Sequence, residues 1–172
     1  MSKGKSWAVQ SGQLTGAKIE IETVQNDGLQ ESVTIINQGT VVQPMSGWVL
    51  ASLRGLIFYP FPENFILHPD MGGVIHSGQA EIEKVTNLQA YREVDLWWTT
   101  DQVWNNHWDT AMLFDANGLE IDRRSYPHER VMGSSANRQK VLIRHNGAFE
   151  ITDAPLVRAK KVTRKQNKMI AS

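Results

Sequence analysis

The chain of 172 residues contains no cysteine. A disulfide framework, a thiolate metal site and a cysteine nucleophile are therefore all excluded. No stretch approaches the ~18 apolar residues of a membrane span, and the basic N-terminus, MSKGKSWAVQSGQ, lacks the apolar run of a secretory signal. These absences predict a soluble, cytoplasmic protein, and the length is sufficient for one domain with its own core.

Helical periodicity is also nearly absent, although residues 80–91, AEIEKVTNLQAY, could hold a turn or two of helix. Short alternating or apolar runs recur instead, separated by turn residues. In AKIEIETV, Ile19 and Ile21 face one way while Glu20 and Glu22 face the other. About ten such runs over about 135 residues predict an antiparallel sandwich or barrel with less than about a tenth helix.

Two Asn-Gly pairs mark tight reversals between these runs. Asn117-Gly118 separates DTAMLFD from LEIDRRSY, and Asn146-Gly147 separates VLIRH from AFEI. Both central positions of a type I′ turn need positive φ, which Asn and Gly tolerate, so we expect a type I′ hairpin at each pair. Pro60 and Pro62 should sit at a sheet edge or a strand start, where no ladder N–H is missing.

Four of the six tryptophans lie in LWWTTDQVWNNHWDTAMLFDANG, residues 96–118. Together with the earlier motifs INQG…SGW and FP…LHPD…IHSG, this segment resembles the lamin tail domain, the immunoglobulin-like module of nuclear lamins, and in particular its bacterial-type members. The resemblance covers residues 17–126. It implies an all-β fold, an immunoglobulin-like antiparallel β-sandwich, with Trp48 and Trp104 in the core and Val103–Asn106 in a loop that closes one end.

The resemblance and the turn signals together suggest a division of the chain. We expect an N-terminal arm over 1–14, a sandwich domain over 15–152 and a basic C-terminal tail over 153–172. The segment 127–152 extends past the family's usual end. Its Asn-Gly hairpin could add strands to a sheet edge, cover the tryptophans, or pair with another protomer to form a homo-oligomer.

Two adjacent tryptophans, Trp97 and Trp98, break the alternation of a strand, because neighbours on a strand point to opposite faces. One of them should therefore lie outside the main core and form an exposed aromatic patch with His107 and Trp108. We also expect Asn105 and Asn106 to satisfy backbone groups of their own loop, as Asn side chains do in turns.

The zero net charge conceals a strong polarity along the chain. Residues 1–122 hold 6 Lys and Arg against 15 Asp and Glu, whereas residues 123–172 hold 12 against 3. The tail has no acid after residue 154 and carries six cations: Arg158, Lys160, Lys161, Arg164, Lys165 and Lys168. Such a tail could hold nucleic acid or an anionic membrane surface through ion release, or it could be a solvated and disordered end.

No catalytic or metal-binding pattern stands out. His68, Asp70 and His76 could converge, but LHPD is more simply a turn with a polar rim, and no nucleophile elbow or phosphate loop is present. We therefore expect no enzyme activity and no cofactor or metal. The favoured interpretation is an adaptor module of lamin-tail type that binds a protein partner. The alternative is a carbohydrate-binding sandwich that uses the cluster of Trp97, Trp98 and Trp108.

Overall fold

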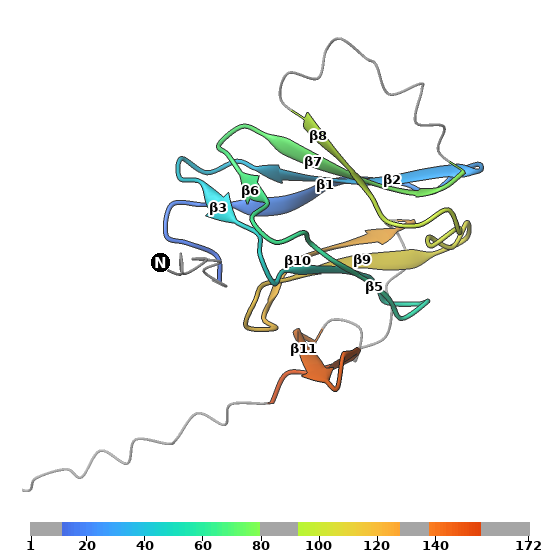
Figure 1. Ribbon diagram of the computed structural model, residues 1–172. Coiled ribbons are helices and arrows are strands. Elements are labelled where there is room, and N and C mark those ends of the chain that lie inside the picture. Colours follow the sequence, from blue (N-terminus) through green and yellow to red (C-terminus); the bar gives the residue numbers. More distant parts are fainter. Residues whose placement is uncertain (1–11, 80–92, 128–137, 156–172) are drawn as a thin grey trace, which may run out of the picture.

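The computed structural model describes residues 12–79, 93–127 and 138–155, and in these ranges it contains strands and no helix (Figure 1). The segment 80–91, with its expected turns of helix, lies outside the described residues. In the described ranges no helix is long and apolar enough to span a membrane. The strands are β1 (Ile19–Gln25), β2 (Gln30–Asn37), β3 (Gln43–Pro44), β4 (Val49–Ser52), β5 (Ile57–Pro60), β6 (Ile66–Leu67), β7 (Gly72–Gly78), β8 (Glu93–Trp97), β9 (Asp109–Phe114), β10 (Glu120–Tyr126), β11 (Lys140–His145) and β12 (Ala148–Asp153).

Two four-stranded sheets stack on each other to form the predicted immunoglobulin-like sandwich (Figure 1). The first sheet has the order β1-β2-β7-β8, and the second sheet has the order β10-β9-β4-β5. Two further pairs, β3–β6 and β11–β12, form small sheets of their own. Pro60 ends β5, which is an edge strand, as the sequence predicted.

One strand pair departs from the antiparallel prediction. β8 runs parallel to β7, with Gly72 opposite Glu93 and His76 opposite Trp97. Parallel neighbours need a connection of a dozen or more residues to bring the chain back to the same end. Residues 79–92 provide that length, so this pair is parallel while the hairpin-linked pairs are antiparallel.

The main core lies between the two sheets and follows the alternation of the strands. Ile19, Ile21, Val33, Ile35 and Ile75 reach it from the first sheet. From the second sheet and its loops it receives apolar side chains that include Trp48, Leu50, Tyr59, Phe61, Val103, Trp104, Ala111 and Leu113. Trp48 and Trp104 are fully or almost fully buried, at 0% and 2% exposure, which confirms their predicted core positions.

The hairpin β11–β12 forms a third layer, which lies on the outer face of the second sheet (Figure 1). Leu142, Phe149 and Ile151 of the hairpin pack there, and the Phe58 and Phe149 ring centroids are 5.3 Å apart. The sheet contributes Val49, Ala51, Met112 and Phe114 to this outer core. Of the roles that the sequence left open, the hairpin neither covers the tryptophans nor joins a sheet edge as a full strand.

The two Asn-Gly turns differ. At Asn146-Gly147 both residues have positive φ, 48° and 80°, as a type I′ hairpin requires. At the other pair the predicted hairpin forms, since β9 pairs antiparallel with β10, but its turn is not type I′: Gly118 has φ 80°, whereas Asn117 does not have positive φ. Here Gly118 N–H donates to Asp115 O, and the Asp115 carboxylate accepts from the N–H of Asn117 and Leu119. Asp115, two residues before Asn117, therefore sets this turn through an Asx-type hydrogen bond.

Candidate functional site

Three connections meet at one end of the sandwich, on the right in Figure 1, and we call this surface the loop end. It comprises residues 26–29, 53–56 and 98–108. Side-chain hydrogen bonds join the three segments: Asn26 Nδ2 donates to Asn105 O (3.2 Å), Gln102 Nε2 to Gly28 O (2.8 Å) and Arg54 Nη1 to Trp108 O (3.3 Å). Clustered loops on a rigid sandwich are the usual place for binding residues.

A buried carboxylate fixes the long segment of the loop end. Glu31 is 1% exposed, and its oxygens accept from Ser77 Oγ (2.7 Å), Val103 N (2.7 Å) and Trp104 N (3.2 Å). Hydrogen bonds to a charged acceptor are about twice as strong as neutral ones. These three donors offset the cost of burying the charge and hold Trp104 in the core.

The asparagine that follows organises the rest of this segment. Asn105 Oδ1 accepts from His107 N (2.9 Å) and Trp108 N (3.2 Å), so its predicted role in its own loop is confirmed. For Asn106 the described hydrogen bonds show no such role. These two bonds fix the backbone at His107 and Trp108, and so they fix where the two side chains start.

Asp109, at the start of β9, is a second buried carboxylate next to the loop end. It is 1% exposed, and its carboxylate accepts from Ser52 Oγ (2.6 Å) and Arg54 N (3.0 Å) across the second sheet, as well as from Thr110 N. The aspartate therefore holds the β4–β5 turn against the start of β9. This contact positions Arg54, whose guanidinium lies 4.4 Å above the centre of the Trp108 ring.

Two tyrosines of the core keep their protons at neutral pH. Burial raises the pKa of Tyr59 to about 12. Burial also raises the pKa of Tyr126, and the nearby carboxylates of Asp109 and Glu31 raise it further. Both phenols are thus neutral structural groups, and neither is an activated nucleophile.

The loop end also exposes two apolar side chains. Leu29 is 61% exposed and Leu56 is 58% exposed. Leu56 also has φ 50°, whereas the other non-glycine residues with positive φ in the described ranges are Asn64, Asp70 and Asn146. Asn and Asp tolerate this region, but for a leucine it costs roughly 1–2 kcal/mol. Leu56 therefore combines backbone strain with an exposed apolar side chain, and neither benefits the folded monomer.

The predicted aromatic patch is divided between two places. Trp98 points into the main core, with its ring 5.5 Å from Tyr59 and 6.0 Å from Trp104. Trp97 is 43% exposed on the outer face of the first sheet and stacks on His76 at 4.5 Å. His107 and the half-buried Trp108 belong to the loop end.

One prediction about these rings is confirmed and another is wrong. Trp97 and Trp108 remain partly accessible, as expected from strand geometry. A single patch is not formed, because within the described ranges no ring contact joins Trp97 to Trp108. The turn expected around LHPD is present, with Asp70 at φ 59°. His76 instead bonds Asp95 of the neighbouring strand β8, and no group of three or more potential metal ligands gathers in the described part of the chain.

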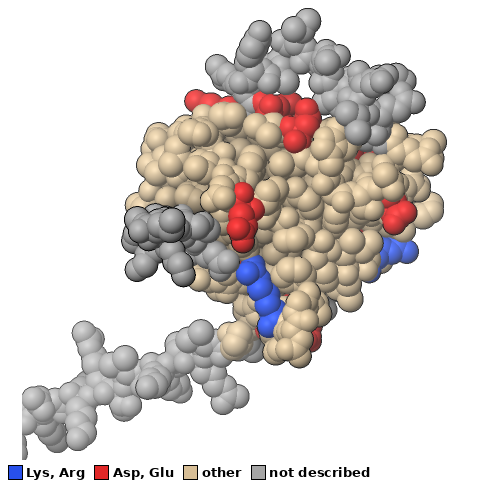
Figure 2. All heavy atoms as spheres, viewed as in Figure 1, with Lys and Arg blue, Asp and Glu red and all other residues tan. Residues whose placement is uncertain are grey.

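The basic side chains of the described residues are mostly engaged near the hairpin. Arg123 pairs with Glu120, and Lys140 and Arg138 pair with Asp153. Figure 2 shows acidic side chains at the top of the molecule, over the β7–β8 edge, and basic ones lower down. The six cations of the tail, Arg158 to Lys168, lie outside the described residues.

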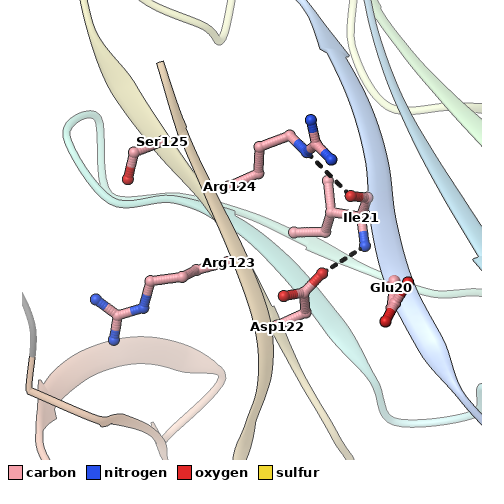
Figure 3. Close-up of a pocket in the computed structure, with 6 residues that line it drawn as sticks. All are labelled: Glu20, Ile21, Asp122, Arg123, Arg124 and Ser125. Atoms are coloured by element: carbon pink, nitrogen blue, oxygen red, sulfur yellow. Dashed lines mark hydrogen bonds between the residues drawn. The ribbon is translucent and has the colours of Figure 1, made fainter. Parts of the chain in front are cut away.

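A surface hollow of about 420 Å³ lies between the edge strands β1 and β10 (Figure 3). Asp122 Oδ2 accepts from Ile21 N (2.7 Å), and Arg124 Nε donates to Ile21 O (3.1 Å). Two side chains of β10 therefore satisfy the outward backbone groups of β1. The hollow therefore lies where β1 and β10 close this side of the sandwich, and its polar side chains have a structural role.

Sequence reasoning found Trp108 and His107 but missed Glu31, Arg54 and Leu56. Glu31 was missed because an acidic residue at the start of a strand is common and does not interrupt the alternation of polar and apolar residues. The strain at Leu56 could not be predicted, because a positive φ is expected from sequence only at residues that favour it, such as glycine and asparagine. A clue was available for Arg54, whose turn, LRGL, places a cation two residues before the exposed Leu56.

Comparison with known proteins agrees with this architecture. No curated protein matches the chain. Residues 13–128 match the family model of the Lamin Tail Domain, and they include the whole two-sheet sandwich and the loop end. The β11–β12 hairpin follows the matched range. Since the match spans more than half of the chain, this protein belongs to the lamin tail domain family.

Proposed function

We propose that this chain is a non-catalytic binding module that engages a protein partner through its loop end. The lamin tail domain family consists of non-enzymatic, immunoglobulin-like domains that are generally involved in interactions. Leu56 is the observation that carries the proposal. A strained and exposed leucine beside an Arg–Trp pair is better explained by contact with a partner than by stability.

The chemistry of the loop end fits a protein surface. Arg and Trp are the residue types most enriched among those that dominate protein–protein binding energy. Arg54 and Trp108 are held in place by Asp109 and Asn105, so little conformational freedom is lost when a partner binds. Leu29 and Leu56 add exposed apolar area to the loop end.

The carbohydrate alternative has less support. A sugar platform needs flat, accessible rings on one surface. Trp98 is turned into the core, one face of Trp97 is covered by His76, and Trp108 lies under Arg54. The three rings therefore cannot act as one platform, and the protein-binding role is preferred.

Site-specific photo-crosslinking tests this proposal. A photoreactive phenylalanine at Leu56 or Trp108, in cells of the source organism, should give a defined protein adduct. The same residue at Ile66, which is 44% exposed and lies in β6 at the other end of the sandwich, is the matched control. The proposal fails if the loop-end positions give no adduct, or if position 66 gives the same one.

Two substitutions separate binding from folding. Leu56→Gly relieves the positive φ and removes the apolar side chain, so it should leave the fold at least as stable while it weakens the adduct formed from position 108. Arg54→Glu should abolish that adduct. If both variants crosslink like the parent, the loop end is not the contact surface.

The basic tail could provide a second, electrostatic contact with nucleic acid or an anionic membrane surface. Six cations without an acid favour this. If all six met phosphates of duplex DNA, log K would fall against log salt with a slope of about −5. The test is a DNA and vesicle titration at two salt concentrations, with and without residues 153–172. Equal binding by the truncated chain would contradict it.

A further inference from the structure

Among the described residues the outer edge of β8 has no neighbouring strand, in contrast to the edge of β1, which side chains of β10 seal. Trp98 N donates to His76 O (2.9 Å), and His76 lies opposite Trp97 in the parallel register. In a parallel pair only alternate residues bond to the neighbour. The N–H and C=O groups of Glu93, Asp95 and Trp97 therefore point away from β7, and in the described ranges no strand pairs with them.

The side chains of this edge have a definite pattern. Glu93, Asp95 and Trp97 lie on the outer face and are exposed, while Val94 and Leu96 lie on the inner face and are partly exposed. The first two residues on the outer face are acidic and the third is aromatic. A strand that pairs here must match this order.

His76 holds the outer face of the edge in place. Its Nε2 lies 2.7 Å from Asp95 Oδ1, and its ring stacks on Trp97. The carboxylate and the indole are therefore ordered before any partner arrives. Because like charges repel across strands, the two acids oppose pairing of this edge with the same edge of a second copy and favour a basic strand.

A segment of this chain has the complementary order. Residues 156–160 are LVRAK. Set antiparallel to β8, they place Leu156 opposite Trp97, Arg158 opposite Asp95 and Lys160 opposite Glu93. Val157 and Ala159 then fall on the inner face, beside Leu96 and Val94. In this register each of the five residues of the segment lies opposite a β8 residue of matching polarity or of opposite charge.

We propose that residues 156–160 of one copy add to the open edge of β8 in a second copy as an antiparallel strand. This β-strand addition pairs the outward backbone groups of Glu93, Asp95 and Trp97. It also explains why the acidic and basic charges of the chain are separated into its two halves. The remaining cations of the tail stay available for other partners.

The reach of the chain requires a second copy. β12 ends at Asp153 in the hairpin, which lies on the outer face of the second sheet. Layers of this kind stack about 10 Å apart, so the first sheet is about 20 Å away. From the Cα of Asp153 to the Cα of Leu156 the chain can span at most about 11 Å. Residue 156 therefore cannot reach Trp97 of its own chain.

Sedimentation equilibrium of the full chain tests the pairing. The wild type should self-associate, and Asp95→Arg or Arg158→Asp should each weaken association about tenfold or more, since an attraction becomes a repulsion. The double variant restores the opposite charges and should recover most of the affinity. Glu22→Arg, on exposed β1, is the control for net charge and should behave like the wild type. A monomeric wild type, or a double variant no better than the singles, overturns the proposal.

Backbone methylation distinguishes strand addition from simple charge attraction. In the proposed register the N–H of Arg158 donates to the open edge and the N–H of Ala159 points away. A labelled peptide of residues 155–165 should bind the full chain carrying Arg158→Asp, whose β8 is intact. N-methylation at Arg158 should abolish binding, whereas N-methylation at Ala159 should preserve it. Equal binding of both methylated peptides would exclude backbone pairing and refute the inference.

Discussion

The two sheets of the sandwich differ in what lies against their outer faces. The second sheet is covered by the β11–β12 hairpin, so all the residues of β4 and β9 are buried. The first sheet has a buried inner face, while β8 at its edge carries exposed side chains. The central strands of the second sheet are therefore buried on both faces, whereas part of the first sheet stays accessible for contacts.

The sequence records this difference in its hydrophobic pattern. β1 alternates apolar and charged residues, as in Ile19-Glu20-Ile21-Glu22. β4 and β9 instead contain unbroken apolar runs, 49–51 and 111–114. A strand with one wet face needs alternation, whereas a strand buried on both faces is continuously apolar. Unbroken runs within an antiparallel sheet therefore predict a third layer.

Removal of a tryptophan from the core between the sheets should have the largest effect, because it damages both sheets. Trp48→Ala or Trp104→Ala should each cost about 3–5 kcal/mol of unfolding free energy. Denaturant unfolding measures this. Trp104→Phe is the matched control: it keeps a ring and removes an indole N–H that finds no acceptor among the described residues, so it should cost less. A parental midpoint for either Ala variant would contradict the core assignment.

The adjacent pair Trp97 and Trp98 compares the two faces of the first sheet directly. Trp98→Ala should cost roughly 2–3 kcal/mol, because its ring packs on Tyr59 and Trp104, whereas Trp97→Ala should cost less than about 1 kcal/mol. Acrylamide quenching provides a second measurement. Loss of Trp97 should reduce the quenchable fluorescence, and loss of Trp98 should not. Equal costs for the two would show that both faces of β8 are covered.

Phe149→Ala tests whether the hairpin truly covers the second sheet. The ring is partly buried against Phe58, so its removal should cost about 2 kcal/mol. It should also expose apolar surface that a dye such as ANS binds. Glu150→Ala, at an exposed position of the same strand, is the control and should change neither property. If Phe149→Ala behaves like this control, the outer core adds no stability.

Much of the fold was predictable because it depends on local patterns. The alternation of apolar and polar residues predicted the strands, and the two Asn-Gly pairs located both C-terminal hairpin turns. Trp48 and Trp104 could be placed in the core from their motifs. The parallel direction of β8 could not be predicted, since it depends on where residues 79–92 return the chain and not on the strand itself.

The candidate site was only partly predictable. The sequence indicated that one of Trp97 and Trp98 must face outward, but it could not show which ring, or that Trp108 packs under Arg54 of another loop. Glu31 and Arg54 act through partners 46 to 73 residues away in the chain. Such contacts exist only after the sheets have stacked, so no local pattern reveals them.

The smallest expected effect concerns the ion pair that ties β11 to β12 in the covering hairpin. A hydrogen bond from Lys140 lowers the pKa of Asp153 below 3.8, and the positive charges of Lys140 and Arg138 lower it further. A carboxyl with a lowered pKa adds stability that is complete above its ordinary pKa and is lost as the pH falls through the lowered value. The first sheet has no part in this pair, so loss of the ion pair should loosen the hairpin's closure without acting on the first sheet.

Because Asp153 is accessible to solvent, salt screens the pair and the effect is modest. NMR titration of the Asp153 carboxyl carbon should show the lowered pKa in the wild type and a value nearer 3.8 in Lys140→Met. Amide exchange in β12 should accelerate in acid in the wild type and be faster at neutral pH in the variant. Identical titration curves in the two proteins would show that Lys140 does not hold this carboxylate, and the hairpin would then depend on the packing of Leu142, Phe149 and Ile151 alone.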